Sequence, residues 1–337
     1  MPQHSKLPPS ASLDAYHRAR RHAAAIDRSP RARVVVSGAD RATYLQGLLT
    51  NDIVALKAGE GCYAAYLTPQ GRMITDLYLY ELGDLLLLTM TRGVKDAVMA
   101  KFEQFIFSED VRLGDVTETF AQIAIVGPEA ASMAALALEG VTEASLAALG
   151  EHGNVRGQFA SEPAIVTRVT DTGEPGFDIF VERAQADTLL HVLAANGVGL
   201  LDPETADALR IEAGVPEFGR DMDEETIPLE AGIEQRAISF SKGCYVGQEV
   251  IIRVLHRGHG RVARKLVGLV TDGQTAVAPG SAITWTGQEV GRVTSSTMSP
   301  GLGKPIALGY VHRDHTAVDT VLAVGDARAI VAAVPFR

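Results

Sequence analysis

The stretch from Cys62 to Glu81, CYAAYLTPQGRMITDLYLYE, decides the fold class of this chain. Two strand-like runs, at 62–67 and 73–81, flank the turn residues Thr68-Pro69-Gln70-Gly71. Proline and glycine between two such runs are typical of a β-hairpin. Hairpins pair antiparallel strands, whereas a doubly wound sheet needs a crossover between its parallel strands. The stretch therefore predicts an antiparallel sheet in an α+β domain.

The sequence around the hairpin continues the same mixture of strands and helices. A buried strand at 33–37 leads into a helix whose apolar residues recur at helical spacing from Tyr44 to Leu49. Further strands are predicted at 84–90, 122–126, 164–169 and 177–181, and further helices at 94–106, 128–138, 184–195 and 203–213. Hairpin-like strand pairs among these helices indicate two α+β units.

From about Arg261 the pattern changes to short strands between glycine and proline turns. These strands are predicted at 262–270, 282–285, 290–296, 306–311 and 327–334. Such a run without a long helix is typical of a small β-barrel or sandwich. We therefore divide the chain into a solvated N-terminal extension with a short helix (1–30), a first α+β domain (31–120, completed by about 203–258), a second α+β domain (121–202) and a C-terminal β domain (259–337).

Composition and charge argue against several classes of protein. The formal net charge of −10 opposes broad binding to nucleic acid, which requires a positive surface. No apolar run approaches the roughly 20 residues that span a bilayer. We expect a cytoplasmic protein with no direct contact with nucleic acid or membrane. The alternative is an organelle matrix, because the arginine-rich segment 1–30 is also compatible with a transit peptide.

Metal and cluster sites are not predicted. The two cysteines, Cys62 and Cys244, are too few for a disulfide framework, and too few to hold a zinc ion or an iron–sulfur cluster unaided. The histidines of the C-terminal third form no helical i, i+4 pair: His256, His259, His312 and His315. We therefore expect a reducing compartment and no bound metal.

The segment KGCYVGQE, at 242–249, is the most distinctive in the chain. Cys244 stands between two glycines, just before a predicted helix. The positive end of the helix dipole, with Lys242 nearby, favours the thiolate form of such a cysteine. The functional interpretation is a reactive or ligand-donating thiol, with Lys242 and Tyr245 beside a bound cofactor. The alternative is a tight turn around a small buried side chain.

Asp76 is a second candidate. On a β-strand it shares a face with Tyr78, while Leu77 and Leu79 point the other way. A carboxylate among apolar and aromatic side chains is costly unless it is paired, so Asp76 and Tyr78 are candidates for contacting a cationic or N–H-rich ligand. The alternative is an ordinary acid at a strand edge.

The segment TGEPGFDI, at 172–179, leads into a strand with Asp178 and Phe180 on one face. A carboxylate can accept two parallel N–H bonds from an amidine-like edge, and an aromatic ring can lie against a flat heterocycle. A pterin offers both features, so Asp178 and Phe180 are candidates for binding one. The alternative, a surface acid after a turn, is the commoner case for such a residue in isolation.

Arg210 lies in LRIEAGVP (209–216), on a helix that ends at Gly214. It is a candidate for binding a carboxylate such as a glutamate tail. The alternative is a surface ion pair with Asp207 or Glu212.

Taken together, these segments resemble one superfamily. LQGLLTND (45–52), the GRMITD segment that ends at Asp76, TGEPGFDI and LRIEAGVP are similar to stretches of the glycine-cleavage aminomethyltransferase, or T-protein. KGCYVGQE is similar to the signature of the YgfZ-type branch, which T-proteins lack. The matches run in order from about residue 33 to the C-terminus.

The resemblance implies a three-domain cloverleaf around a tetrahydrofolate pocket, with a small β-barrel last. It also implies a role for several residues: Cys244 matches the cysteine of the YgfZ-type branch, and Asp76 the catalytic aspartate of T-proteins. Asp178 matches the acid, usually a longer glutamate, that grips the pterin. Arg210 matches the arginine that follows the second domain. Asp76 is an acid that many YgfZ-type proteins replace.

Three functions are compatible with the resemblance. The one we expect is a tetrahydrofolate-binding protein that assists assembly or repair of iron–sulfur enzymes, including tRNA-modifying ones. Its partners would be those enzymes or cluster-assembly proteins. The second is a folate-dependent aminomethyltransferase or demethylase, in which Asp76 stabilises a developing positive charge. The third is a non-catalytic adaptor.

Overall fold

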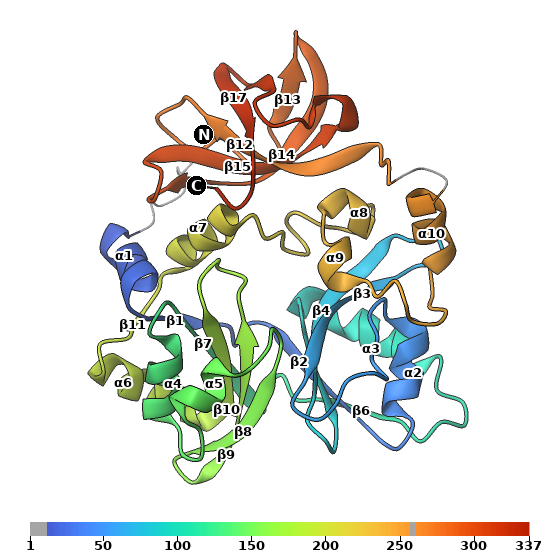
Figure 1. The fold of residues 1–337 in the computed structure, drawn as a ribbon, viewed down its shortest axis with the longest axis vertical. Coiled ribbons are helices and arrows are strands. Elements are labelled where there is room, and N and C mark those ends of the chain that lie inside the picture. The colour runs from blue at the N-terminus through green and yellow to red at the C-terminus, as the bar shows by residue number, and fades with distance from the viewer. Residues whose placement is uncertain (1–11, 257–259, 337) are drawn as a thin grey trace, which may run out of the picture.

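The computed structural model describes residues 12–256 and 260–336. It consists of three lobes, with two α+β domains side by side and a β-barrel beyond them (Figure 1). The predicted α+β fold class, with two α+β domains and a C-terminal barrel, is confirmed. Within the described ranges, no helix combines the length and apolarity that crossing a lipid bilayer requires.

The first domain is built on a five-stranded antiparallel sheet that contains the predicted hairpin. Its strands, in spatial order, are β3 (Gly61–Leu67), β4 (Met73–Glu81), β5 (Leu86–Met90), β2 (Ala32–Ser37) and β6 (Arg112–Asp115). Gly71 closes the hairpin turn at φ +76°, where a side chain would be strained and would meet Val250.

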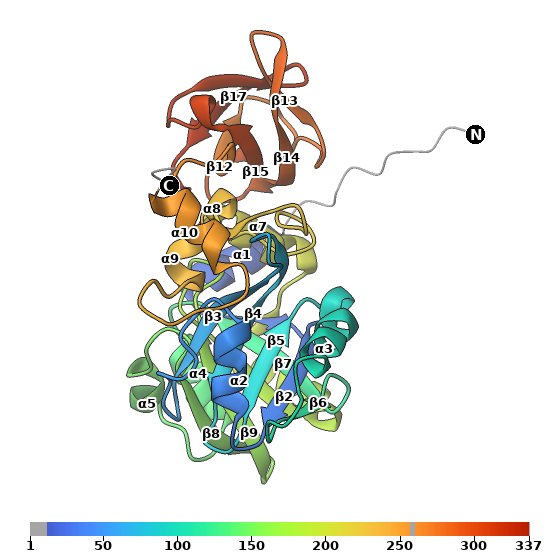
Figure 2. The same ribbon diagram turned by 90° about the vertical axis from the view of Figure 1, so that its right-hand side faces the viewer.

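Helices cover both faces of this sheet. On one face lie α2 (Arg41–Leu48) and α3 (Lys95–Glu103), which pack against buried leucines of β4 and β5 (Figure 2). Beside β3, the opposite face is covered by α8 (Pro228–Ala231), α9 (Glu234–Ala237) and α10 (Gln248–His256). The rest of that opposite face is left for the second domain.

The second domain has a six-stranded sheet. In spatial order its strands are β11 (Gly199–Leu200), β1 (Ala24–Asp27), β7 (Phe120–Val126), β10 (Gly176–Glu182), β9 (Glu162–Val169) and β8 (Asn154–Phe159). Its main core lies under α4 (Ala130–Ala137), α5 (Glu143–Ala147) and α6 (Ala186–Ala195). Residues of β10 alternate between this core and the face turned to the first domain.

The N-terminal segment differs from the solvated extension expected over 1–30. Helix α1 (Leu13–Arg21) buries Tyr16 and Ala19, and β1 pairs with both β11 and β7 inside the second sheet. The Ala-rich sequence of β1 carries no strand pattern of its own, and its place depends on partners about 100 and 175 residues away in the chain.

The C-terminal lobe is a closed barrel of six strands. Around the barrel they are β12 (Arg264–Thr271), β15 (Lys304–His312), β14 (Gln288–Ser299), β13 (Ala282–Trp285), β16 (Val321–Val324) and β17 (Ala327–Ala332). Helix α7 (Pro203–Ala213) packs against α1 and against β14 and β15. Short 3₁₀-helices occur at Arg92–Val94, Arg183–Gln185 and Arg313–His315.

Candidate functional site

The candidate site lies where the two α+β sheets face one another. Side chains alternate along β4, so Leu77 and Leu79 enter the core under α2 and α3 while Tyr78 and Tyr80 point to the second domain. Phe180 on β10 points back, and its ring meets Tyr80 edge-on at 6.3 Å between centroids. The strand face that carries Asp76 and Tyr78 thus meets the strand face that carries Asp178 and Phe180 at the interface between the two domains.

Asp76 is held in place by a tyrosine on the neighbouring strand. The carboxylate is 8% exposed, and the Tyr63 hydroxyl donates a 2.7 Å hydrogen bond to Oδ2. Burial raises the pKa of Asp76, against the opposing effects of Arg31 and of the Tyr63 hydrogen bond. A buried, oriented carboxylate of this kind can stabilise a positive charge that develops beside it, because little water screens it.

An aromatic and cationic shell surrounds this carboxylate. Tyr63 and Tyr78 lie 5.1 Å apart, with the Arg236 guanidinium 5.3 Å from the Tyr63 ring and that of Arg31 5.6 Å from the Tyr78 ring. Neither guanidinium has an ion-pair partner among the residues the structure describes. The His152 ring lies 5.3 Å from that of Tyr78, tilted by 51°, and burial lowers the pKa of His152 to about 4. The shell therefore suits a flat ligand with an anionic group.

Asp178 already has internal partners. Nη1 of Arg28 lies 3.1 and 3.3 Å from the two carboxylate oxygens, and Nε2 of Gln122 donates to Oδ2 at 2.8 Å. Nη2 of Arg28 also pairs with Asp171 at 2.6 Å. Burial raises the pKa of Asp178 and Arg28 opposes that rise. The carboxylate of Asp178 is thus already occupied by one guanidinium nitrogen and one amide nitrogen, and the proposed pterin contact of Asp178 stays a prediction.

Arg210 lies outside this cluster and joins α7 to the barrel. Its guanidinium pairs with Asp207 and Asp221, each at 2.7–2.8 Å, and donates to Ser295 on β14 at 3.0 Å. Of the two surface partners weighed above, Asp207 is the one found. Glu212 instead accepts from Arg20 and Tyr16 on α1.

Lys242 anchors the KGCYVGQE segment to the first domain. Its ammonium donates to the carbonyl oxygens of Gln46, Leu49 and Asn51, each at 2.7 Å. Burial lowers the pKa of Lys242 to about 8. These carbonyls lie at the C-terminal end of α2, where a cation is favourable. Lys242 is therefore committed to the backbone rather than to the thiol.

The remaining residues of the segment lie around this anchor. Cys244 is exposed, and α10 begins at Gln248, four residues later, so the thiol does not stand directly at the helix N-terminus. Tyr245 is buried, with the Lys242 ammonium 5.3 Å from its ring. Asn51 links the anchor to the Asp76 site, because its side-chain amide donates to the Tyr63 and Arg236 carbonyls.

The interface contains polar atoms whose hydrogen-bond partners a ligand can supply. Oε1 of Gln122 and Nδ1 of His152 are buried and have no partner in the described ranges. Such atoms need an explanation, and a polar heterocycle or bound water is the usual one. Two tyrosine rings, an acid and these free polar atoms fit a pterin-like group. No cluster of histidine, cysteine and acid suited to a metal occurs in residues 12–256 and 260–336, and His259 lies outside them.

Several residues of the site could not be identified from the sequence alone. Arg28 stands out only as part of the basic segment 1–30, and Arg31, His152 and Arg236 stand in no recognisable pattern. A signal was available for Tyr63 alone, since the hairpin register places it opposite Tyr78. Arg28, Arg31 and His152 approach the site from loops and Arg236 from α9, and their positions depend on how distant segments of the chain fold together.

Comparisons with known proteins agree over most of the chain. Residues 9–242 match the GCVT N-terminal domain family, and residues 264–336 match the glycine cleavage T-protein C-terminal barrel domain. The aminomethyltransferase of Rubrobacter xylanophilus is 34% identical over 302 residues, which cover 89% of this chain and 79% of that protein. The aminomethyltransferase of Shouchella clausii is 32% identical over 92% of this chain and 84% of its own length.

A solved structure shows the same fold. The glycine cleavage system aminomethyltransferase T from Bartonella henselae superposes with a TM-score of 0.86, over 96% of this chain and 89% of that one, at 24% identity. The three lobes described above are therefore arranged as in that protein.

Proposed function

Because this chain belongs to the glycine cleavage T-protein family, we propose that it is a folate-dependent transferase of an aminomethyl-derived one-carbon unit. The observation that supports this most is Asp76, which is buried and oriented by Tyr63 within an aromatic shell. The relatives named above are called aminomethyltransferases. This assignment places the second of the three functions above ahead of the iron–sulfur role.

In this proposal the interface between the two sheets holds tetrahydrofolate. The rings of Tyr63 and Tyr78 would contact its flat ring, and the guanidinium groups of Arg31 and Arg236 beside them would donate to acceptor atoms of that ring. Bound tetrahydrofolate supplies the nitrogen that exchanges the one-carbon unit. Asp178 takes part only if its Arg28 partner shifts fully onto Asp171.

Asp76 would act on the charge that develops at the reacting nitrogen. Its ionised carboxylate favours a cationic transition state, and its burial strengthens that attraction. Tyr63 holds the carboxylate in one orientation through the bond to Oδ2, and Oδ1 would face the reacting group. The surrounding aromatic rings keep water from competing for the same position.

A turnover assay tests the proposal. The purified protein, given tetrahydrofolate and a small aminomethyl donor, should release the one-carbon product. Asp76→Asn should lower the rate by about 100-fold or more, while tetrahydrofolate binding by calorimetry stays close to wild type. Asp178→Ala tests the pterin contact in the same titration. Absence of turnover together with normal folate binding would remove the transferase proposal.

The exposed thiol of Cys244 favours a second candidate function. It stands in the segment that resembles the YgfZ-type signature, on a loop fixed by the Lys242 anchor and open to a partner. This arrangement supports a role of Cys244 toward iron–sulfur enzymes. In cells lacking the gene, Cys244→Ala should fail to restore iron–sulfur enzyme activity if this role holds, whereas Asp76→Asn should restore it.

The two variants together separate the functions. If only Asp76→Asn fails to restore activity in cells lacking the gene, the result points to the transferase. If only Cys244→Ala fails to restore it, the result points to the iron–sulfur role. Full rescue by both, with no folate affinity, would leave the adaptor.

A further inference from the structure

A cavity lies between the same two sheets, beyond the Asp76 cluster. Along β4 one face carries Asp76, Tyr78 and Tyr80, and then Leu82, which lines the cavity. Phe180 forms part of its wall and also contacts Tyr80, so the Tyr80–Phe180 pair separates the cavity from the polar site.

The cavity is of a size and character suited to a small ligand. Its volume is about 350 Å³, within the range of about 300–1,000 Å³ found for small-molecule sites. Both domains contribute its apolar wall, which includes Val35, Leu85, Leu87, Phe120, Ile165 and Phe180. Apolar walls of this kind bind the hydrocarbon or aromatic part of a ligand.

One buried cation stands in this apolar wall. Arg33 is fully buried, and its Nη2 donates to the carbonyl oxygens of Ser29 and Thr117 at 3.0 and 2.5 Å. Its Nε and Nη1 atoms are also buried, and they have no partner in the part of the chain that the structure describes. A buried charge without a counter-ion is costly, and an anion would remove that cost.

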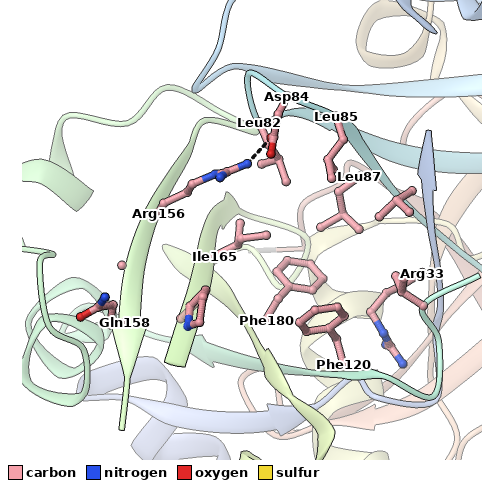
Figure 3. Close-up of a pocket in the computed structure, with 15 residues that line it drawn as sticks. Arg33, Leu82, Asp84, Leu85, Leu87, Phe120, Arg156, Gln158, Ile165 and Phe180 are labelled. Atoms are coloured by element: carbon pink, nitrogen blue, oxygen red, sulfur yellow. Dashed lines mark hydrogen bonds and ion pairs between the residues drawn. The ribbon is translucent and has the colours of Figure 1, made fainter. Parts of the chain in front are cut away.

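Charges of both signs lie in the neighbourhood of Arg33. Burial lowers the pKa of Arg33 to about 10; the positive charges of Arg183 and Arg92 add to that effect, and the carboxylates of Glu118 and Asp27 oppose it. In Figure 3, Arg33 and Phe120 stand at one end of the cavity, and the Arg156–Asp84 ion pair stands at the opposite end. Arg156 is therefore already paired, whereas Arg33 is not.

We propose that this cavity binds a small carboxylic acid with an apolar body, and that Arg33 receives the carboxylate. The apolar part would lie against Leu87, Ile165 and Phe180. Phe120, which is only half-buried beside Arg33, would turn to admit the carboxylate to the unpartnered Nη1. A hydrogen bond between a guanidinium N–H and a carboxylate oxygen is charged on both sides and is stronger than one between neutral groups. This site does not depend on the folate proposal.

Decanoate is a suitable probe, with 1-decanol as its uncharged counterpart. By calorimetry, the full-length protein should bind decanoate at least about tenfold more tightly than 1-decanol, since charged hydrogen bonds are added. Arg33→Met should abolish that preference while 1-decanol binding persists. Ile165→Trp should block both ligands, because it fills the cavity without touching Arg33's charge.

Further variants keep the test decisive. Arg156→Gln should leave the preference intact; its loss in that variant would place the carboxylate at the mouth and overturn the role of Arg33. Phe120→Ala should strengthen decanoate binding. If Arg33→Met fails to fold, the binding of decanoate to Ile165→Trp and Phe120→Ala tests the proposal in its place.

Absence of decanoate binding to the wild type, or equal binding of the acid and the alcohol, would overturn the proposal. Asp76→Asn should bind decanoate as the wild type does.

Discussion

The Arg28 guanidinium lies against both carboxylate oxygens of Asp178, with Nη1 3.1 Å from one and 3.3 Å from the other. Its Nη2 is bound to Asp171 at 2.6 Å, so one arginine bridges two acids from a loop about 150 residues earlier in the chain. The Nη1 atom and the Gln122 amide together occupy both oxygens of Asp178. A pterin that donates two parallel N–H bonds to this carboxylate would have to displace Arg28.

Arg28 should also be a stabilising residue. Arg28→Met would leave Asp171 and Asp178 without their cation, and removing one partner of a buried pair typically costs about 3 kcal/mol or more. We expect a loss of that size in the free energy of unfolding, measured by urea denaturation at pH 7. The control is Arg92→Met, which removes an exposed pair with Glu118 and should cost under about 0.5 kcal/mol. Equal losses in the two variants would show that the Arg28 bridge contributes no more to the free energy of unfolding than an exposed ion pair does.

The Tyr63–Asp76 hydrogen bond should set the acid limb of the activity profile. Burial raises the pKa of Asp76, and the Tyr63 hydroxyl partly counteracts the rise. Since the ionised carboxylate is the active form, turnover should fall as the pH falls through this raised pKa. Tyr63→Phe removes the opposing bond, so the acid limb should move to higher pH.

The matched control for that profile is Tyr66→Phe. Tyr66 lies on the same strand but points into the opposite core, where it packs on Phe102. Its substitution should leave the acid limb unmoved. A limb that is the same in wild type and Tyr63→Phe would mean that Asp76 is not the group that titrates.

Asp76 should weaken the fold at neutral pH. A carboxyl whose folded-state pKa is raised binds its proton more tightly when folded, so stability falls as the pH rises from the ordinary pKa through the raised one. Asp76→Asn removes the charge and should raise the free energy of unfolding at pH 7 by about 1 kcal/mol. Denaturant titrations at pH 4 and pH 7 check this. The difference between variant and wild type should shrink at pH 4, and a constant difference would contradict the linkage.

The elements that the sequence predicts well are those with a local pattern. The hairpin at 62–81 follows from its two runs and its Pro-Gly turn, and the facing of Asp76 and Tyr78 follows from alternation along β4. Helix α7 begins and ends as predicted, at Pro203 and before Gly214. Where one stretch of chain contains both the pattern and its cause, sequence reasoning succeeds.

The parts that the sequence does not predict depend on distant partners. Lys242 stands two residues from Cys244, which suggests a charge beside the thiol, yet its ammonium binds carbonyls more than 190 residues away. The guanidinium partner of Asp178 comes from the loop between β1 and β2, and that loop is positioned by β1, which lies in the same sheet as β10. Such contacts exist only once distant segments of the chain have folded together, so no local pattern contains them.

Lys242 should act as a structural tie between the cysteine loop and α2. Lys242→Met leaves the Gln46, Leu49 and Asn51 carbonyls without their shared donor, and we expect a loss of about 2 kcal/mol in unfolding free energy. The loop should also become accessible to limited proteolysis near residues 239–247. Lys57→Met, at an exposed lysine of the same domain, is the control and should change neither the unfolding free energy nor the proteolysis of the loop. Unchanged proteolysis in Lys242→Met would argue against the anchor.

The two cysteines should differ sharply in reactivity, which bears on the second candidate function. Cys244 is exposed, whereas Cys62 is buried and burial raises its pKa to about 12. With iodoacetamide at pH 7.5, mass mapping should find rapid alkylation at Cys244 and almost none at Cys62. Cys244→Ser should remove the rapid phase, and unfolding in guanidinium should make both wild-type thiols react. Comparable rates at Cys62 and Cys244 in the folded protein would contradict the burial of Cys62 and remove accessibility as the basis for a special role of Cys244.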